Sequence, residues 1–126
     1  MKTETICAIA TAPGIGGIGI VRISGEDAFN IINKIFKPKN VGAGLESARQ
    51  MKYGHIIDTN TNEIIDEVLV SFFRTPKSYT TEDMCEINSH GGRLVMNKIV
   101  EICLENGAVM AKPRRIYKKS ISKSEE

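Results

Sequence analysis

Apolar and polar residues alternate most clearly between Asp83 and Ser89. Cys85, Ile87 and Ser89 occupy one set of alternate positions, whereas Glu86 belongs to the other set. This period of two is typical of a β-strand, whose successive side chains point to opposite faces of a sheet. The pattern therefore predicts a strand with one buried face and one mostly polar face that carries a carboxylate.

The next segment has apolar residues at helical spacing. Gly91 and Gly92 turn the chain into it, and Gly107 follows it at a position where glycine commonly ends helices. We expect a helix that ends near Asn106. Its predicted apolar face consists of Leu94, Val95, Ile99, Ile102 and Cys103.

Two strands and a second helix are predicted in the first third of the chain. Thr5–Thr11 and Ile20–Ser24 are apolar and rich in β-branched residues. Ser24 is the expected N-cap of the helix that follows, with Asp27 as an imperfect capping-box partner, and the helix should end before Pro38. Its predicted buried stripe is Ala28, Ile31, Ile32, Ile35 and Phe36.

The middle of the chain has the pattern of a β-hairpin. Met51–Ile57 and Glu63–Phe73 are strand-like, and Asp58–Asn62 between them is rich in Asp, Asn and Thr. Ala108–Ala111 adds a short last strand, whereas Lys39–Arg49 is expected to be a loop. Several strands with two main helices favour the α+β class, with a mixed β-sheet and helices packed mainly on one face.

Composition narrows the class of protein. A chain of 126 residues with 41% hydrophobic and 25% charged residues is typical of one globular domain. No apolar run approaches the roughly 20 residues of a membrane span, and the N-terminus lacks the pattern of a signal peptide. We therefore expect a cytoplasmic protein with no membrane partner.

The charge is distributed unevenly. The last fifteen residues carry six Lys or Arg and two acids, so the rest of the chain has 11 basic and 13 acidic residues and a net charge of about −2. A broad basic surface for nucleic acid is therefore not expected in the folded part.

Two motifs lead to structural interpretations. Gly14–Gly19 matches G-x-G-x-x-G, but a strand rather than a helix follows it, which favours a tight connection between neighbouring strands over a dinucleotide site. The three cysteines lie in apolar patterns, and no ligand spacing joins them to a histidine in a zinc site. We expect buried free thiols at Cys7, Cys85 and Cys103.

Arg22 and Glu86 are the candidate binding residues. On their spacing alone they can form a structural ion pair or face solvent separately. Alternatively, a partly desolvated carboxylate can accept two N–H donors from the edge of a pterin or guanine ring. Nearby, His90–Gly92 is either a tight strand-to-helix turn or a set of backbone N–H donors for an anion.

Six short motifs follow one another along the chain. In order they are I-A-T-A-P-G-I-G-G-I-G-I-V-R-I-S-G (9–25), Y-G-H-I-I-D (53–58), I-D-E-V-L-V (65–70), P-K-S-Y-T-T-E-D (76–83), E-I-N-S-H-G-G (86–92) and L-E-N-G-A (104–108). From Thr5 to Pro113 the chain resembles the N-terminal domain of the tRNA modification GTPase family known as MnmE or TrmE.

This resemblance implies a fold similar to the folate-binding module of aminomethyltransferases, a homodimer, and binding of 5-formyltetrahydrofolate or another one-carbon tetrahydrofolate. It makes Arg22 and Glu86 folate contacts. It also implies that an intact relative works with an FAD-dependent partner to modify the wobble uridine of tRNA, using GTP hydrolysis.

The chain itself has no G-x-x-x-x-G-K-[ST] motif, so it has no predicted GTP site. No nucleophile, metal set or acid–base pair is evident either, which disfavours a stand-alone one-carbon transferase. We expect a folate-binding and dimerisation domain that is not catalytic on its own. The alternative is an interaction module with an incomplete folate site and no small-molecule ligand.

The pattern of the family stops at Pro113. Relatives continue with a motif similar to P-G-E-F-T-K-R-A-F-L-N-G that precedes a further basic folate contact, whereas this chain reads R-R-I-Y-K-K-S-I-S-K-S-E-E. Codons for Arg114–Lys123, read in a shifted frame, can encode G-E-F-T-K-R-A-F-L. We therefore expect a folate-binding domain at 1–113 and an out-of-frame, disordered basic tail at 114–126; the alternative is an evolved basic tail.

The nucleotide sequence of the gene tests this explanation of the tail. We expect an inserted base at or just after the codon for Pro113, with the missing motif encoded in the neighbouring frame. If the neighbouring frame does not encode the motif, the frame change is wrong and the evolved tail is left as the explanation.

Overall fold

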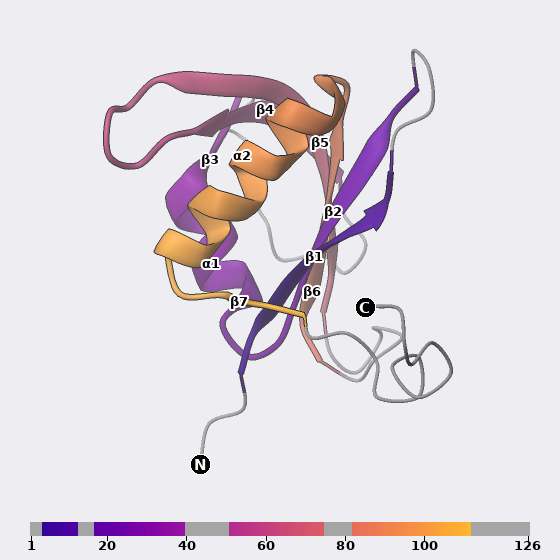
Figure 1. The fold of residues 1–126 in the computed structure, drawn as a ribbon. Helices are drawn as coiled ribbons and strands as arrows, with labels where there is room; N and C mark the ends of the chain where they lie inside the picture. Colours follow the sequence, from indigo (N-terminus) through magenta and orange to yellow (C-terminus); the bar gives the residue numbers. More distant parts are fainter. Residues whose placement is uncertain (1–3, 13–16, 40–50, 75–81, 112–126) are drawn as a thin grey trace, which may run out of the picture.

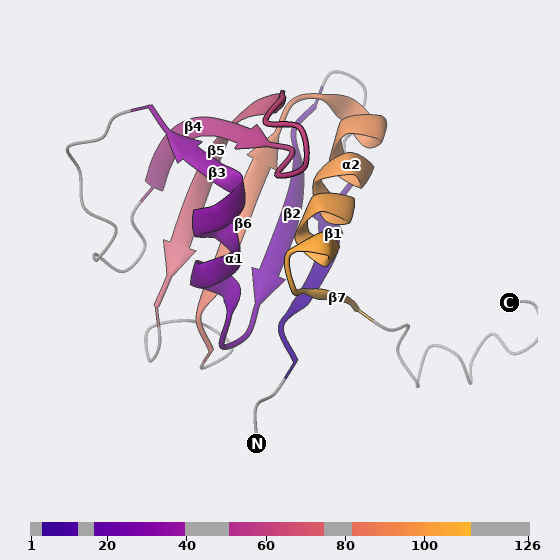
Figure 2. The ribbon, with the colours of Figure 1, turned by 90° about the vertical axis from the view of Figure 1, so that its left-hand side faces the viewer.

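A mixed β-sheet with both helices on one of its faces forms the body of the protein (Figures 1 and 2). The structure is a computed structural model that describes residues 4–12, 17–39, 51–74 and 82–111. Within these residues the sheet has seven strands in the order β3-β4-β5-β6-β2-β1-β7. The predicted α+β class with two main helices is confirmed.

The elements agree with the predicted strands to within one residue at each end. A short strand, β3, was not predicted, and most of the predicted loop at Lys39–Arg49 lies outside the described residues, as does the tail at 114–126. The strands are β1 (Ile6–Thr11), β2 (Gly19–Ser24), β3 (Phe36–Pro38), β4 (Met51–Ile57), β5 (Ile64–Phe73), β6 (Met84–Ser89) and β7 (Val109–Met110); the helices are α1 (Ala28–Ile35) and α2 (Gly92–Glu105).

Strand β2 lies between β1 and β6, so distant parts of the chain become neighbours. It pairs antiparallel with both of them. Strands β3 to β6 continue the antiparallel sheet on one side, and β7 is parallel to β1 at the other edge. The predicted hairpin is β4 and β5, whose register includes Tyr53 opposite Leu69.

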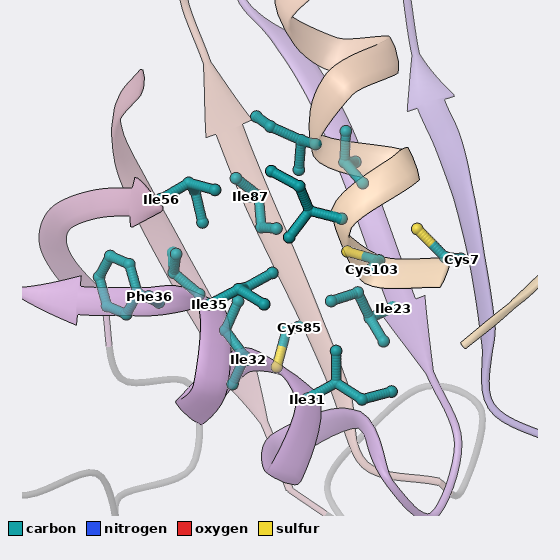
Figure 3. Close-up of a cluster of buried hydrophobic side chains, with 14 of the residues drawn as sticks. Cys7, Ile23, Ile31, Ile32, Ile35, Phe36, Ile56, Cys85, Ile87 and Cys103 are labelled. Atoms are coloured by element: carbon teal, nitrogen blue, oxygen red, sulfur yellow. The ribbon is translucent and has the colours of Figure 1, made fainter. Parts of the chain in front are cut away.

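The hydrophobic core fills the layer between the sheet and the two helices (Figure 3). Alternate residues of the central strands, such as Ile23 and Ile87, are fully buried there. Each such side chain contributes roughly 1.5–3 kcal/mol relative to an exposed one. The prediction of buried free thiols is confirmed, and burial raises the pKa of the Cys85 thiol. The helical contribution to the core is Ala28, Ile31, Ile32, Ile35, Met96, Ile99, Val100, Ile102 and Cys103.

The predicted cap of the first helix is wrong. Ser24 is the last residue of β2, and its Oγ donates a hydrogen bond to Glu82 Oε1 at 3.1 Å. The chain then turns at Gly25, where φ is +144°, and α1 begins only at Ala28. The amide of Asp27 donates to Thr5 Oγ1 at 2.9 Å, so a neighbouring segment accepts from the helix N-terminus instead of a local cap.

One residue on each predicted helical face was assigned wrongly. Phe36 is buried as expected, but it is the first residue of β3 rather than part of α1. Leu94 is 84% exposed, whereas Met96 is fully buried. Met96, Ile99 and Cys103 repeat at intervals of three and four residues along α2, and Leu94, two residues before Met96, is rotated by about 200° to the opposite side.

The turn between β4 and β5 is attached to α2 by polar contacts. Asp58 Oδ1 accepts a hydrogen bond from the Asn60 amide at 2.9 Å, and Asp58 Oδ2 lies 3.4 Å from Lys98 Nζ. The Asn106 side chain donates to Thr59 Oγ1 at 3.0 Å. These contacts hold the hairpin against the C-terminal half of the helix.

Asp58 should therefore stabilise the fold in a pH-dependent way. The hydrogen bond from Asn60 and the nearby ammonium group of Lys98 lower the pKa of this carboxyl below its ordinary value of 3.8. A lowered pKa stabilises the folded state above the unfolded pKa, and this contribution is lost as the pH falls through the folded pKa. Asp58→Asn should lower the melting temperature near neutral pH and make its decrease in acid shallower.

Thermal unfolding followed by circular dichroism from about pH 7 to about pH 2 measures this effect. Glu101→Gln is the matched control, because Glu101 also lies near Lys98 but is an exposed residue on the helix surface. The role of Asp58 is contradicted if Asp58→Asn and Glu101→Gln give the same pH profile.

Candidate ligand-binding site

The candidate residues lie on the face of the sheet that points away from the helices. Val21 and Ile23 of β2 are buried in the core, so Arg22 between them points to the opposite, open face. Cys85 and Ile87 place Glu86 of β6 on that face in the same way. The strand pattern therefore positions both predicted site residues.

Arg22 and Glu86 form an ion pair across neighbouring strands. They are direct partners in the antiparallel register of β2 and β6. Arg22 Nε and Nη2 both donate to Glu86 Oε2, at 2.9 and 2.7 Å. The side chains are 46% and 20% exposed, and ion pairs at such partly exposed sites contribute only about 0–1 kcal/mol to stability.

The two oxygens of Glu86 differ in how they are used. Oε2 accepts both Arg22 bonds, whereas no donor in the described part of the chain reaches Oε1. Each carboxylate oxygen accepts about two hydrogen bonds. One ligand N–H can therefore bind at Oε1 with the ion pair intact, but a ligand edge that uses both oxygens must displace Arg22 from Oε2.

Apolar side chains flank this ion pair on the open face. Ile20 lies two residues from Arg22 on β2. Leu69 lies two residues from Ser71, the β5 residue opposite Glu86. Both apolar side chains are partly exposed. Met51 and Tyr53 of β4 are exposed farther along the same face. A carboxylate with a free oxygen beside flat apolar surface suits a ring that has one polar edge.

A second charged group lies at the β3 side of the open face. Glu67 Oε2 accepts from Lys39 Nζ at 2.9 Å and lies 3.6 Å from His55 Nε2. Hydrogen bonds from Lys39 and Tyr53 lower the pKa of the Glu67 carboxyl, and the bond to Glu67 raises the pKa of Tyr53. This carboxylate is therefore part of a local network with Lys39, His55 and Tyr53.

The strand-to-helix connection at Gly91 and Gly92 is a tight turn. Gly92 has a φ of +85°, a backbone conformation that residues with a side chain rarely adopt, and α2 begins there. The Gly91 amide donates to Ser89 Oγ at 3.3 Å, and Ser89 Oγ donates to Asp66 Oδ2 at 2.6 Å. The Gly91 amide, one of the backbone donors that an anion site would need, is thus already hydrogen-bonded. This favours a tight strand-to-helix turn over an anion site.

A hollow of about 160 Å³ lies elsewhere, between the β1 edge, α2 and the end of β7. It contains neither candidate residue and no charged side chain, so it does not extend their site. Its lining consists of Cys7, Ala8, Ile9, Asn97, Val100, Met110 and Ala111.

Neither a metal-binding cluster nor a membrane-spanning helix is present among the residues that the structure describes. Within residues 4–12, 17–39, 51–74 and 82–111, His, Cys, Asp and Glu side chains form no group of three or more that could hold a metal ion. Neither helix in these ranges has the length and apolar content needed to cross a lipid bilayer.

Comparison with known families identifies the kind of domain. A sequence model described as "GTP-binding protein TrmE N-terminus" matches residues 5–118. The chain belongs to this family. The predicted resemblance to the TrmE N-terminal domain is therefore confirmed. The match runs past Pro113, into residues outside the described ranges, so the domain boundary at 113 stays a prediction.

Individual relatives of the TrmE type are also similar to the chain. It is 50% identical over 121 residues to the "tRNA modification GTPase MnmE" of Thermoanaerobacter pseudethanolicus. The aligned region covers 95% of this chain and 26% of the relative. The protein of the same name from Alkaliphilus metalliredigens is 56% identical over 107 residues, covering 83% and 23%. The chain thus spans about a quarter of the length of these curated relatives.

Within this TrmE-type domain, Arg22 and Glu86 form an ion pair, which is one of the arrangements that the sequence analysis left open. Their role as folate contacts stays a prediction. Ser71 of β5 was not found from the sequence, although it is the partner of Glu86 on the side away from Arg22. Only the register of β5 against β6 reveals it, because nothing in the residues around Ser71 distinguishes this serine.

Proposed function

We propose that this chain is a folate-binding and dimerisation domain of a tRNA-modifying GTPase. Its ligand is 5-formyltetrahydrofolate or another one-carbon tetrahydrofolate, held at Arg22 and Glu86. The observation that carries this proposal is the partly buried Glu86 carboxylate, with Oε2 bonded to Arg22 and Oε1 open to a donor. Membership of the TrmE N-terminus family supports this choice of ligand class.

The chemistry of the ligand fits this arrangement. A reduced pterin presents N–H donors on the edge of a flat ring, and a carboxylate that accepts such a donor contributes about 1.5–3 kcal/mol. The ring can lie against the apolar surface around Leu69 while its edge faces Glu86 Oε1. Arg22 holds the carboxylate in place.

The activities of the whole relatives would depend on parts that this chain does not contain. The printed name of the relatives is "tRNA modification GTPase MnmE", and this chain lacks a P-loop motif. In our proposal, residues 1–113 supply folate binding and dimerisation, and 114–126 is a tail without a folded role. GTP hydrolysis, the FAD-dependent partner and the wobble uridine of tRNA belong to the longer cytoplasmic protein.

Glu86→Gln tests the ligand role of the carboxylate. This substitution keeps the shape of the side chain but removes its charge and turns one acceptor into a donor. Affinity for 5-formyltetrahydrofolate should fall by about 10- to 150-fold, the equivalent of one lost charge-assisted bond of about 1.5–3 kcal/mol. Isothermal titration of the purified chain measures this change.

Glu67→Gln is the matched control for this titration. Glu67 is a carboxylate on the same face of the sheet and also accepts from a cation, but it already takes part in hydrogen bonds with both Lys39 and Tyr53. Its substitution should leave folate affinity unchanged. Absence of binding in the wild-type chain would overturn the folate proposal and support the alternative interaction module.

Dimerisation is tested separately. Met51 and Tyr53 are exposed on the β4 part of the open face, beside the surface proposed for the ligand, and we propose that a second copy packs against this part. Light scattering at high concentration should give twice the mass of the chain, and Met51→Glu should shift the population toward monomer. Leu94→Glu, on the helix surface, should not. A wild-type monomer at every concentration would contradict the dimer.

A further inference from the structure

Ser71 occupies the position opposite Glu86 on the side away from Arg22. The register places Arg22 of β2, Glu86 of β6 and Ser71 of β5 in one row across three adjacent strands. Val70 and Phe72 are buried in the core, so the Ser71 side chain belongs to the open face. Directly opposed residues have Cβ atoms about 4.5–5.5 Å apart, which puts the hydroxyl beside the Glu86 carboxylate.

The Ser71 hydroxyl has no hydrogen-bond partner among the described residues. Ser71 is only 9% exposed, and no described group forms a hydrogen bond with its Oγ. A serine hydroxyl can both donate and accept hydrogen bonds, so Ser71 Oγ is available to a ligand on the open face. The neighbouring Glu86 Oε1 is likewise without a donor from the described residues.

Glu86 Oε1 and Ser71 Oγ together can recognise a particular pattern of hydrogen-bond donors and acceptors on the edge of a ring. Glu86 Oε1 accepts only, so it selects an N–H group. A serine hydroxyl can donate and accept, so beside a carboxylate acceptor it can donate to a ring nitrogen or carbonyl oxygen next to that N–H. An N–H adjacent to such an acceptor is the pattern of a cyclic amide or amidine in a heteroaromatic ring.

We propose that Ser71 is a third ligand contact, which together with Glu86 recognises the amide-type edge of the bound ring. This inference rests on the proposed function, because it concerns the same folate site. Arg22 anchors one carboxylate oxygen from the β2 side, and Ser71 completes recognition from the β5 side. The site then spans three strands rather than one charged pair.

Two substitutions of Ser71 distinguish the effect of losing the hydroxyl from the effect of changing the side-chain volume. Ser71→Ala removes the hydroxyl without adding volume and should weaken binding of 5-formyltetrahydrofolate by about three- to tenfold, the loss of one hydrogen bond. Ser71→Thr keeps the hydroxyl on a β-branched side chain that suits a strand, and it should bind within about twofold of the wild-type chain. Isothermal titration gives the affinities, and thermal unfolding shows that each variant is folded.

Ser24→Ala is the matched control. Ser24 is also a serine on the open face, but its hydroxyl already donates to Glu82 and lies one row away from Glu86. It should leave the affinity unchanged. Equal weakening by Ser24→Ala and Ser71→Ala would overturn the proposal, because the effect would then belong to the face as a whole.

The remaining outcomes distinguish this inference from the function on which it rests. Unchanged binding in Ser71→Ala, together with strong loss in Glu86→Gln, would overturn the role of Ser71 and keep the folate site. Failure of the wild-type chain to bind 5-formyltetrahydrofolate would overturn both. Loss in Ser71→Ala that Ser71→Thr restores supports a hydroxyl contact with the ligand.

Discussion

The antiparallel pairing of β2 with β6 is the constraint on which the rest of this structure depends. It joins segments 64 residues apart and sets Arg22 directly opposite Glu86. Both strands bury alternate apolar residues beneath the helices, so the register and the orientation of the polar residues are decided together. A slip of β6 by one residue would turn Ile87 to the open face and Glu86 into the core, and the cost of burying an unpaired charge opposes this.

The two faces of the sheet consequently have different roles. One face packs against α1 and α2 and contains the core, including the three thiols (Figure 3). The other face carries an ion pair that adds little to stability, together with a carboxylate oxygen that no described donor reaches and the hydroxyl of Ser71. Because the apolar residues that pack against the helices form the core, polar residues such as Ser71 and Glu86 can occupy the open face without disrupting it.

The places where the sequence analysis failed share a cause. Ser24 has the residue type and position of a helix cap, but its hydroxyl bonds to Glu82 from a distant segment, and Thr5 accepts from the amide before α1. Leu94 fits an apolar helical pattern, yet the sheet covers the side of α2 that carries Met96. Residue type and local spacing indicate which hydrogen bonds and which buried positions are possible for a residue. The segments that pack against it in the fold determine which of these form.

The sequence by itself determined the strands, the two helices, the buried thiols and the family, because alternation, helical spacing and ordered motifs are local properties of the chain. It also singled out Arg22 and Glu86 as candidates. Only the tertiary structure decided that both Arg22 donors use one oxygen of Glu86 and that Ser71 completes the row. Strand order and register bring these groups together, and they result from burying all the apolar faces at once, which no single segment of the sequence encodes.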